Sequence, residues 1–251
     1  MEKLIDIDGN EYQTVQIGNQ TWMAENLRVK HFKDGTPILH APTDTEWLKA
    51  TGRFNENGEF VKKMGFQGFH GSIPAWCSYH NKLENENIYG LLYNYAVIDS
   101  KPDIAPEGWR VPSENDFVEL FKYLDGEPEF YGFSLLPGML KAKGAWWDNP
   151  FHNESGFTAL PAGFRHTKLG PDFTQLNSIQ WREATEEAKN FIPDIKFDGL
   201  QENCTFWTSS RGRGGPMIIY MRNEKIEEKD FVTVDYTSCF HSGRSIRLLK
   251  D

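Results

Sequence analysis

The sequence lacks any long apolar run, so it predicts no membrane-spanning helix. A helix needs about 20 consecutive apolar residues to cross a bilayer, and no segment approaches that length. An export signal is missing from the first residues as well, since residues 1–7 already contain Glu2 and Asp6. We therefore expect no membrane insertion, and a chain that either folds in the cytoplasm or has lost an export signal.

The sequence also has fewer basic than acidic residues. The chain has 27 Lys and Arg residues against 36 Asp and Glu residues, which gives a formal net charge of −9. A phosphate backbone would be repelled on average, which argues against nucleic acid as a partner. Cysteine is scarce too, and Cys77, Cys204 and Cys239 are too few for a disulfide scaffold in 251 residues.

Familiar catalytic patterns are absent as well. The sequence contains neither Gly-x-Ser-x-Gly nor His-Glu-x-x-His. Its most glycine-rich segment, residues 212–215, lacks the Lys-Ser/Thr ending of a phosphate-binding loop and predicts a turn between strands. We therefore expect a protein that binds rather than catalyses.

The first secondary-structure signals lie near the N-terminus. The apolar residues Leu4, Ile5 and Ile7 lead into Asp8-Gly9-Asn10, a strong turn signal, and an alternating pattern over residues 12–17 predicts the return strand of a hairpin. A short helix is expected over residues 44–50. We also expect the N- and C-terminal strands to pair and close the domain.

The clearest helix follows Pro112. Ser113 is a good N-cap with Asp116 three residues later, and apolar residues follow at helical spacing until residues 125–126 end the helix. A second helix is predicted over residues 179–190. Short strands are expected at residues 157–164, 205–209, 217–222, 231–236 and 245–249. Two main helices, short antiparallel strands and long loops predict one α+β domain over residues 1–251.

Six segments follow one another in an order typical of a known family: residues 6–27, 87–98, 107–126, 153–165, 206–210 and 243–251. In these segments the chain strongly resembles the Fibrobacter succinogenes major paralogous domain. The resemblance covers nearly the whole length. It implies a C-type-lectin-like fold, distantly similar to formylglycine-generating enzymes, in proteins that are mostly exported or on the cell surface.

Two departures from the family pattern affect the interpretation. Members usually carry a pair of cysteines where this chain has Ala105 and Leu248. Losing both suits a reducing compartment, which favours folding in the cytoplasm. The chain also has a loop and helix insertion at about residues 168–202, which we expect to remodel the binding face.

The predicted ligand-binding surface is aromatic and basic. One of two adjacent tryptophans on extended backbone should face outward, and the late strands of the resembling fold supply further aromatic and Arg side chains. Such side chains suit a glycan or protein ligand, although an aromatic core with solvated arginines explains each residue singly. The candidates are Trp146, Trp147, Trp207, Arg211, Arg213, Tyr220, Arg222 and His241.

Calcium is the one cofactor for which the sequence offers ligands. Asp148, Asn149, Asn153 and Glu154 place four oxygen-bearing side chains within seven residues, although turn capping by Asp and Asn side chains explains them equally well. Two other functions stay open. One is a structural or receptor-binding part of a phage tail or injection system, where an oligomer is expected. The other is a formylglycine-type oxidase, which would need copper at Cys204 or Cys239.

Overall fold

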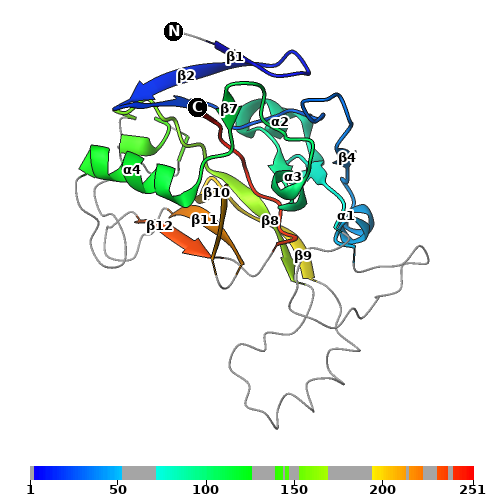
Figure 1. The fold of residues 1–251 in the computed structure, drawn as a ribbon. Helices are drawn as coiled ribbons and strands as arrows, with labels where there is room; N and C mark the ends of the chain where they lie inside the picture. Colours follow the sequence, from blue (N-terminus) through cyan, green and yellow to red (C-terminus); the bar gives the residue numbers. More distant parts are fainter. Residues whose placement is uncertain are drawn as a thin grey trace.

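A computed structural model gives the structure of the protein. It describes residues 3–52, 72–125, 139–143, 145–146, 153–168, 194–212, 215–222, 231–236 and 240–251. These residues form three sheets and four α-helices (Figure 1), which confirms the predicted α+β class. Within the described residues, no helix is both long and apolar enough to span a membrane.

The first sheet joins the two ends of the chain. Its order is β1-β2-β3-β13-β7, with Leu249 of β13 opposite Trp22 of β3. The N-terminal hairpin and the pairing of N- and C-terminal strands are thereby confirmed. Its strands are β1 (Lys3–Ile5), β2 (Glu11–Ile17), β3 (Gln20–Met23), β13 (Leu249–Lys250) and β7 (Trp109–Arg110).

The second sheet has the order β12-β11-β10-β8-β9 and corrects two expectations. One of its strands lies inside the predicted insertion and pairs with β8 from Ala162 opposite Leu200 to Lys168 opposite Asp194. In addition, β8 and β10 run parallel rather than antiparallel. The strands are β8 (Ala162–Lys168), β9 (Asp194–Leu200), β10 (Asn203–Gly212), β11 (Gly215–Arg222) and β12 (Phe231–Tyr236).

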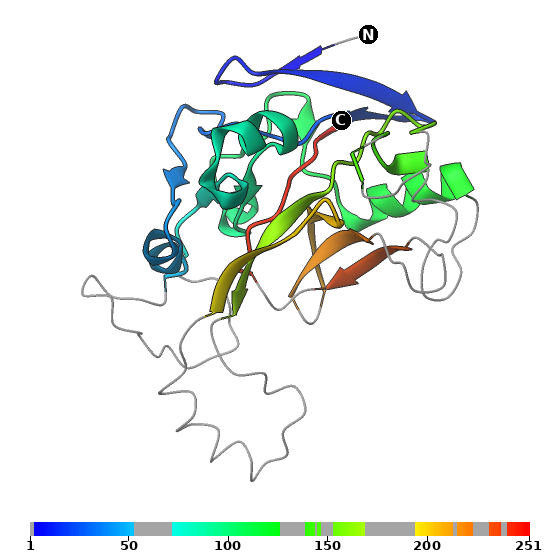
Figure 2. The ribbon, with the colours of Figure 1, turned by 180° about the vertical axis from the view of Figure 1, so that it is seen from behind.

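A small third sheet and the helices complete the fold. The sheet contains β4 (Leu39–His40), β5 (Ala75–Cys77) and β6 (Leu92–Tyr93), and the helices are α1 (Asp44–Ala50), α2 (Leu83–Tyr89), α3 (Ala96–Asp99) and α4 (Glu114–Asp125), with a 3-10 turn η1 (Tyr79–Asn81). The predicted helix at residues 179–190 lies outside the described residues. Figures 1 and 2 show the C-terminal segment, in red, running between α1–α3 on one side and α4 on the other.

Helix α4 begins as its sequence predicts. The Ser113 hydroxyl accepts a hydrogen bond from the Asp116 amide at 3.3 Å, and the Asp116 carboxylate accepts one from the Ser113 amide at 2.6 Å. This reciprocal pair satisfies two amides that would otherwise lack partners at the helix start. The apolar face of α4 packs into a core where Phe117 meets Trp22 at 4.8 Å and Phe206 at 6.2 Å between ring centroids.

Candidate functional site

Two of the tryptophans predicted to bind ligand lie in the interior. Trp207 has no exposed surface, and its indole nitrogen donates to the Tyr93 carbonyl oxygen at 2.7 Å. Trp146 is also buried and donates to the Ala159 carbonyl oxygen at 2.8 Å. A buried indole N–H needs an acceptor, and in both tryptophans a backbone carbonyl oxygen provides it. Neither ring has a face open to a ligand, so the expectation that Trp207 contacts one is not supported.

Of the other predicted ligand-binding residues, the two arginines that the structure describes lie at opposite ends of one hairpin. Arg211 and Arg222 are both exposed, but Arg211 lies next to Pro216 near the turn of the β10–β11 hairpin, whereas Arg222 lies opposite Asn203 at the far end. Arg211 is paired with Asp99 at 2.5 Å. Tyr220 is half-buried and His241 is buried, while Trp147 and Arg213 lie outside the described residues.

The predicted calcium ligands are only partly described, because Asp148 and Asn149 lie outside the described residues. The Asn153 side chain is hydrogen-bonded to Thr158: it accepts from the Thr158 amide at 2.8 Å and donates to the Thr158 hydroxyl at 2.9 Å. Glu154 is exposed. In the described parts of the chain, no group of three or more His, Cys, Asp or Glu residues could hold a metal ion. The calcium site stays a prediction.

A turn at residues 6–10 organises the N-terminal hairpin. Both oxygens of the Asp6 carboxylate are occupied: one accepts from the amides of Asp8 and Asn10, and the other from the Asn10 side chain and the Tyr12 hydroxyl at 2.6 Å. Burial, together with the hydrogen bond to Asp6, raises the pKa of Tyr12 well above its usual value. Because the Asp6 oxygens already have partners, this carboxylate shapes the turn and is not free to bind a metal.

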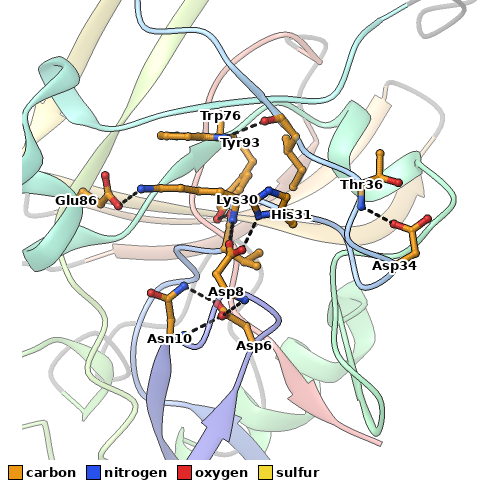
Figure 3. Close-up of polar contacts among 12 residues, drawn as sticks. Asp6, Asp8, Asn10, Lys30, His31, Asp34, Thr36, Trp76, Glu86 and Tyr93 are labelled. Atoms are coloured by element: carbon orange, nitrogen blue, oxygen red, sulfur yellow. Dashed lines mark hydrogen bonds and ion pairs between the residues drawn. The ribbon is translucent and has the colours of Figure 1, made fainter.

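A charged network fixes this turn to the body of the protein (Figure 3). The Asp8 carboxylate accepts from the Lys30 amide at 2.5 Å and lies 2.5 Å from Nδ1 of His31. The Lys30 ammonium forms an ion pair with Glu86 of α2 at 2.6 Å and lies 5.0 Å from the centroid of the Trp76 ring. We call Asp8, Lys30, His31 and Glu86 the turn network. It joins the hairpin turn to residues 30–31 and to α2.

Beside this turn lies a cleft of about 730 Å³, defined by one wall from the hairpin and one from the loop before β7. The first sheet therefore curls enough for its two edge strands, β1 and β7, to border the same hollow. We call this hollow the edge cleft. Its lining residues are Ile5, Asp6, Ile7, Lys33, Asp103, Ile104, Pro106, Glu107, Gly108, Trp109, Arg110 and Asp251.

The edge cleft has an acidic lining. Asp6, Asp103, Glu107 and Asp251 contribute four carboxylates against the two cations Lys33 and Arg110. The Arg110 guanidinium already binds Asp116, which lies outside the lining, through two hydrogen bonds of 2.6 and 2.7 Å. Arg110 also pairs with Asp251 at 3.5 Å, and the four carboxylates of the lining still outnumber its two cations, which favours a cationic ligand.

The sequence pattern did not predict the edge cleft, because its aromatic and Arg residues indicated a binding face on the late strands. One signal was available in the N-terminal hairpin. Ile5 and Ile7 alternate with Leu4 and Asp6, and of these four the two isoleucines are the ones exposed, at 56% and 48%. Two apolar side chains that lie together on the solvent face of a hairpin indicate a binding surface.

The chain matches the family model of the Fibrobacter succinogenes major domain over residues 15–250. It belongs to this family. The matched residues cover nearly the whole chain and confirm the family resemblance, with residues 15–27 of the first segment inside the match. No similar protein was found among curated proteins or among solved structures. Of the residues that line the edge cleft, Ile5, Asp6 and Ile7 precede the matched range, and residues 103–110 lie within it.

Proposed function

We propose that this family member is a non-catalytic binding module that recognises a protein ligand in the edge cleft. The acidic hollow between two edge strands carries the proposal, because it is concave, combines apolar and charged side chains, and has a volume typical of ligand sites. We also propose that the sheets follow the C-type-lectin-like arrangement, which the pairing of β3 with β13 supports.

A protein ligand is favoured over a glycan by the burial of the tryptophans. A sugar ring stacks on an aromatic face that is open to solvent. Each described tryptophan has at most 8% of its surface exposed, including Trp109, which borders the cleft: these are Trp22, Trp47, Trp76, Trp109, Trp146 and Trp207. The cleft instead offers carboxylates and exposed isoleucines, which suit basic and apolar side chains of a peptide.

The cleft walls are held in place before any ligand arrives. The turn network fixes the hairpin wall, and the opposite wall is tied by a hydrogen bond of 2.9 Å from the Lys33 amide to the Asp103 carbonyl oxygen. Asp103 also accepts from the Ala105 amide at 3.1 Å through its side chain. Preformed walls reduce the ordering cost of binding, which supports a recognition role for this surface.

A thiol-based oxidase has less support. Cys204 lies in the core between β8 and β11, and burial raises the pKa of its thiol to about 12. A thiol that stays protonated and enclosed at neutral pH is a poor copper ligand or nucleophile. Cys239 lies outside the described residues. We therefore keep the binding module as the proposed function.

The test is a binding screen of the purified chain against arrays of basic peptides, acidic peptides and glycans. The cleft variant carries Asp103→Asn and Glu107→Gln, which remove two charges and keep the acceptor for the Ala105 amide. The matched control carries Asp194→Asn and Asp198→Asn on β9, which remove two exposed charges away from the cleft.

We expect basic peptides to bind, to weaken with added salt, and to bind the cleft variant about tenfold less tightly while the control is unchanged. Basic peptides that bind both variants equally would contradict the proposal. So would binding to the glycan array alone, which would return the function to carbohydrate recognition at another surface.

A further inference from the structure

The backbone of β1 leaves hydrogen-bonding groups facing away from its partner strand. The Asp6 amide donates to the Asn10 carbonyl oxygen at 3.1 Å, and the same register places Leu4 opposite Tyr12 and Ile5 opposite Glu11. In an antiparallel pair, hydrogen-bonded and non-hydrogen-bonded positions alternate. Leu4, like Asp6, is therefore at a hydrogen-bonded position of the β1–β2 pair. Ile5 is at a non-hydrogen-bonded position, so its N–H and C=O groups point away from β2.

The side chains of β1 divide in the same way. Leu4 is 4% exposed and packs into the core, whereas Ile5 is 56% exposed and lines the edge cleft together with Ile7. β1 ends the first sheet, so no strand among the described residues covers its outer edge. An edge strand with outward backbone groups and exposed apolar side chains is a template for one more strand.

We propose that an extended segment of a partner protein, carrying Lys or Arg side chains, pairs with β1 and lies in the edge cleft. This inference rests on the proposed function and specifies how the cleft binds. Backbone hydrogen bonds to Ile5 supply register, and Ile5 and Ile7 pack against apolar side chains of the added strand. Basic side chains reach Asp103 and Glu107 on the opposite wall, where charge complementarity selects them.

A second copy of this chain fits the cleft less well. The chain carries a net charge of −9, and pairing two acidic clefts would bring like charges together. Lys3 at the start of β1 forms an ion pair with Glu11 of the same hairpin at 2.6 Å, so its charge is already matched within its own chain. The basic side chains in the cleft are therefore expected to come from another protein.

The probe is a peptide of about eight residues, a typical strand length, in which valine and lysine share the alternate positions that form one face of the strand and threonine fills the positions between them. One control peptide has glutamate for lysine, and another has N-methyl groups on the edge that would face β1. Affinity is measured by fluorescence anisotropy with the full chain, and exchange of the Ile5 amide proton is followed by NMR. Strand addition predicts that the Ile5 amide exchanges about tenfold more slowly in the complex, and that N-methylation weakens binding about tenfold.

Two substitutions separate backbone pairing from side-chain contact. Ile5→Pro removes the outward N–H, and proline is tolerated on an edge strand where that group faces solvent. Ile5→Ala keeps the N–H and shortens the side chain. We expect both variants to keep the far-ultraviolet circular dichroism of the parent, and Ile5→Pro to bind the peptide more weakly than Ile5→Ala.

Strand addition is overturned if the lysine peptide binds in a charge-dependent way while N-methylation has no effect and the Ile5 amide stays unprotected. That outcome leaves the acidic cleft as a binding site for basic side chains alone. Equal binding of the lysine and glutamate peptides overturns both proposals. A dimer that dissociates on Ile5→Pro substitution would assign the edge to a second copy and also overturn strand addition by a basic partner.

Discussion

Arg247 provides the sharpest test of how this fold is held together, because it is a buried cation whose direct partners are uncharged. Its guanidinium donates to the Asn26 side-chain oxygen at 2.8 Å and to the carbonyl oxygens of Met23 at 3.1 Å, Thr158 at 2.7 Å and Phe157. The guanidinium also lies over the Phe157 ring at 4.7 Å. Burial lowers its pKa to about 10, which still leaves it charged near neutral pH.

We expect Arg247→Met to lower the free energy of unfolding by about 3 kcal/mol. Each hydrogen bond from a charged donor contributes about 1.5–3 kcal/mol, and leaving its acceptor buried without a partner costs about 1–3 kcal/mol. Four such bonds would exceed this figure, but removing a buried cation also relieves its desolvation cost, which is several kcal/mol. Arg247→Lys keeps the charge and loses the planar fork, so we expect a smaller loss of about 2 kcal/mol.

Urea unfolding followed by circular dichroism measures both variants, with Arg222→Met as the control at an exposed site. The control should stay within about 0.5 kcal/mol of the parent. The reasoning fails if Arg247→Met unfolds at the same urea concentration as the parent or at a higher one. In that case the desolvation cost of the guanidinium would outweigh its four hydrogen bonds, as happens when some buried ion pairs are replaced by apolar residues.

Three further predictions concern local features. Asp116→Asn should destabilise the protein by about 1–2 kcal/mol at neutral pH, because it removes the carboxylate charge to which Arg110 and the Ser113 amide donate. Burial alone would raise the pKa of the Asp116 carboxyl, but hydrogen bonds from Arg110 and Ser113 outweigh burial and lower that pKa. The carboxylate therefore stabilises the fold at pH values above its pKa in the unfolded chain. This stabilisation is lost as the pH falls through the lower pKa of the folded protein. Urea titrations from neutral to acid pH should therefore show the parent and Asp116→Asn converging; parallel curves would contradict this. At Thr158, whose φ is 57°, glycine should give a protein about 1 kcal/mol more stable than alanine, because alanine keeps the left-handed strain; the reverse order in urea would contradict it. Cys77 and Cys204, whose thiol pKa values burial raises to about 11 and about 12, should remain unmodified when the folded protein is alkylated at mildly alkaline pH and mapped by mass spectrometry; labelling of either in the folded protein would show that its site opens.

Local sequence signals predicted the parts of the fold that depend on near neighbours. Turn chemistry at Asp8-Gly9-Asn10 gave the hairpin, and the Ser113–Asp116 cap gave the start of α4. The helix over residues 44–50 was also predicted with its bounds, and the structure shows Thr43 and Glu46 forming its capping box. Each of these elements is specified by residues a few positions apart, which a single sequence displays directly.

Burial of the late aromatic side chains could not be predicted in the same way. Trp207 was expected at the surface because it follows the pattern of a ligand-facing strand in the resembling fold. Its position is decided by Tyr93, which is 114 residues away in the chain and accepts its indole hydrogen bond. Strand β9 was missed for a similar reason, since its register depends on β8 across residues 169–193, and its charged residues Asp194, Lys196 and Asp198 resemble a loop in isolation.

The position of the edge cleft follows from how the chain closes on itself. β13 joins β7 to the rest of the first sheet, since it pairs with β3 through Leu249 opposite Trp22 and with β7 through Leu249 opposite Arg110. The segment before β13 carries Arg247, whose hydrogen bonds hold it to Met23 at the end of β3 and to the 157–158 loop.

Ala105 and Leu248, where the family resemblance implies paired cysteines, both lie in the same apolar core cluster. We infer that apolar packing and the Arg247 contacts hold this segment in place in this chain. If this argument holds, Arg247→Lys should loosen both edge strands at once. Amide exchange at Trp109 of β7 and Leu4 of β1 should then accelerate together, although the Arg247 guanidinium donates to Asn26, Met23 and residues 157–158 and to neither of these two residues. Faster exchange at only one of the two strands would show that the cleft walls are held independently.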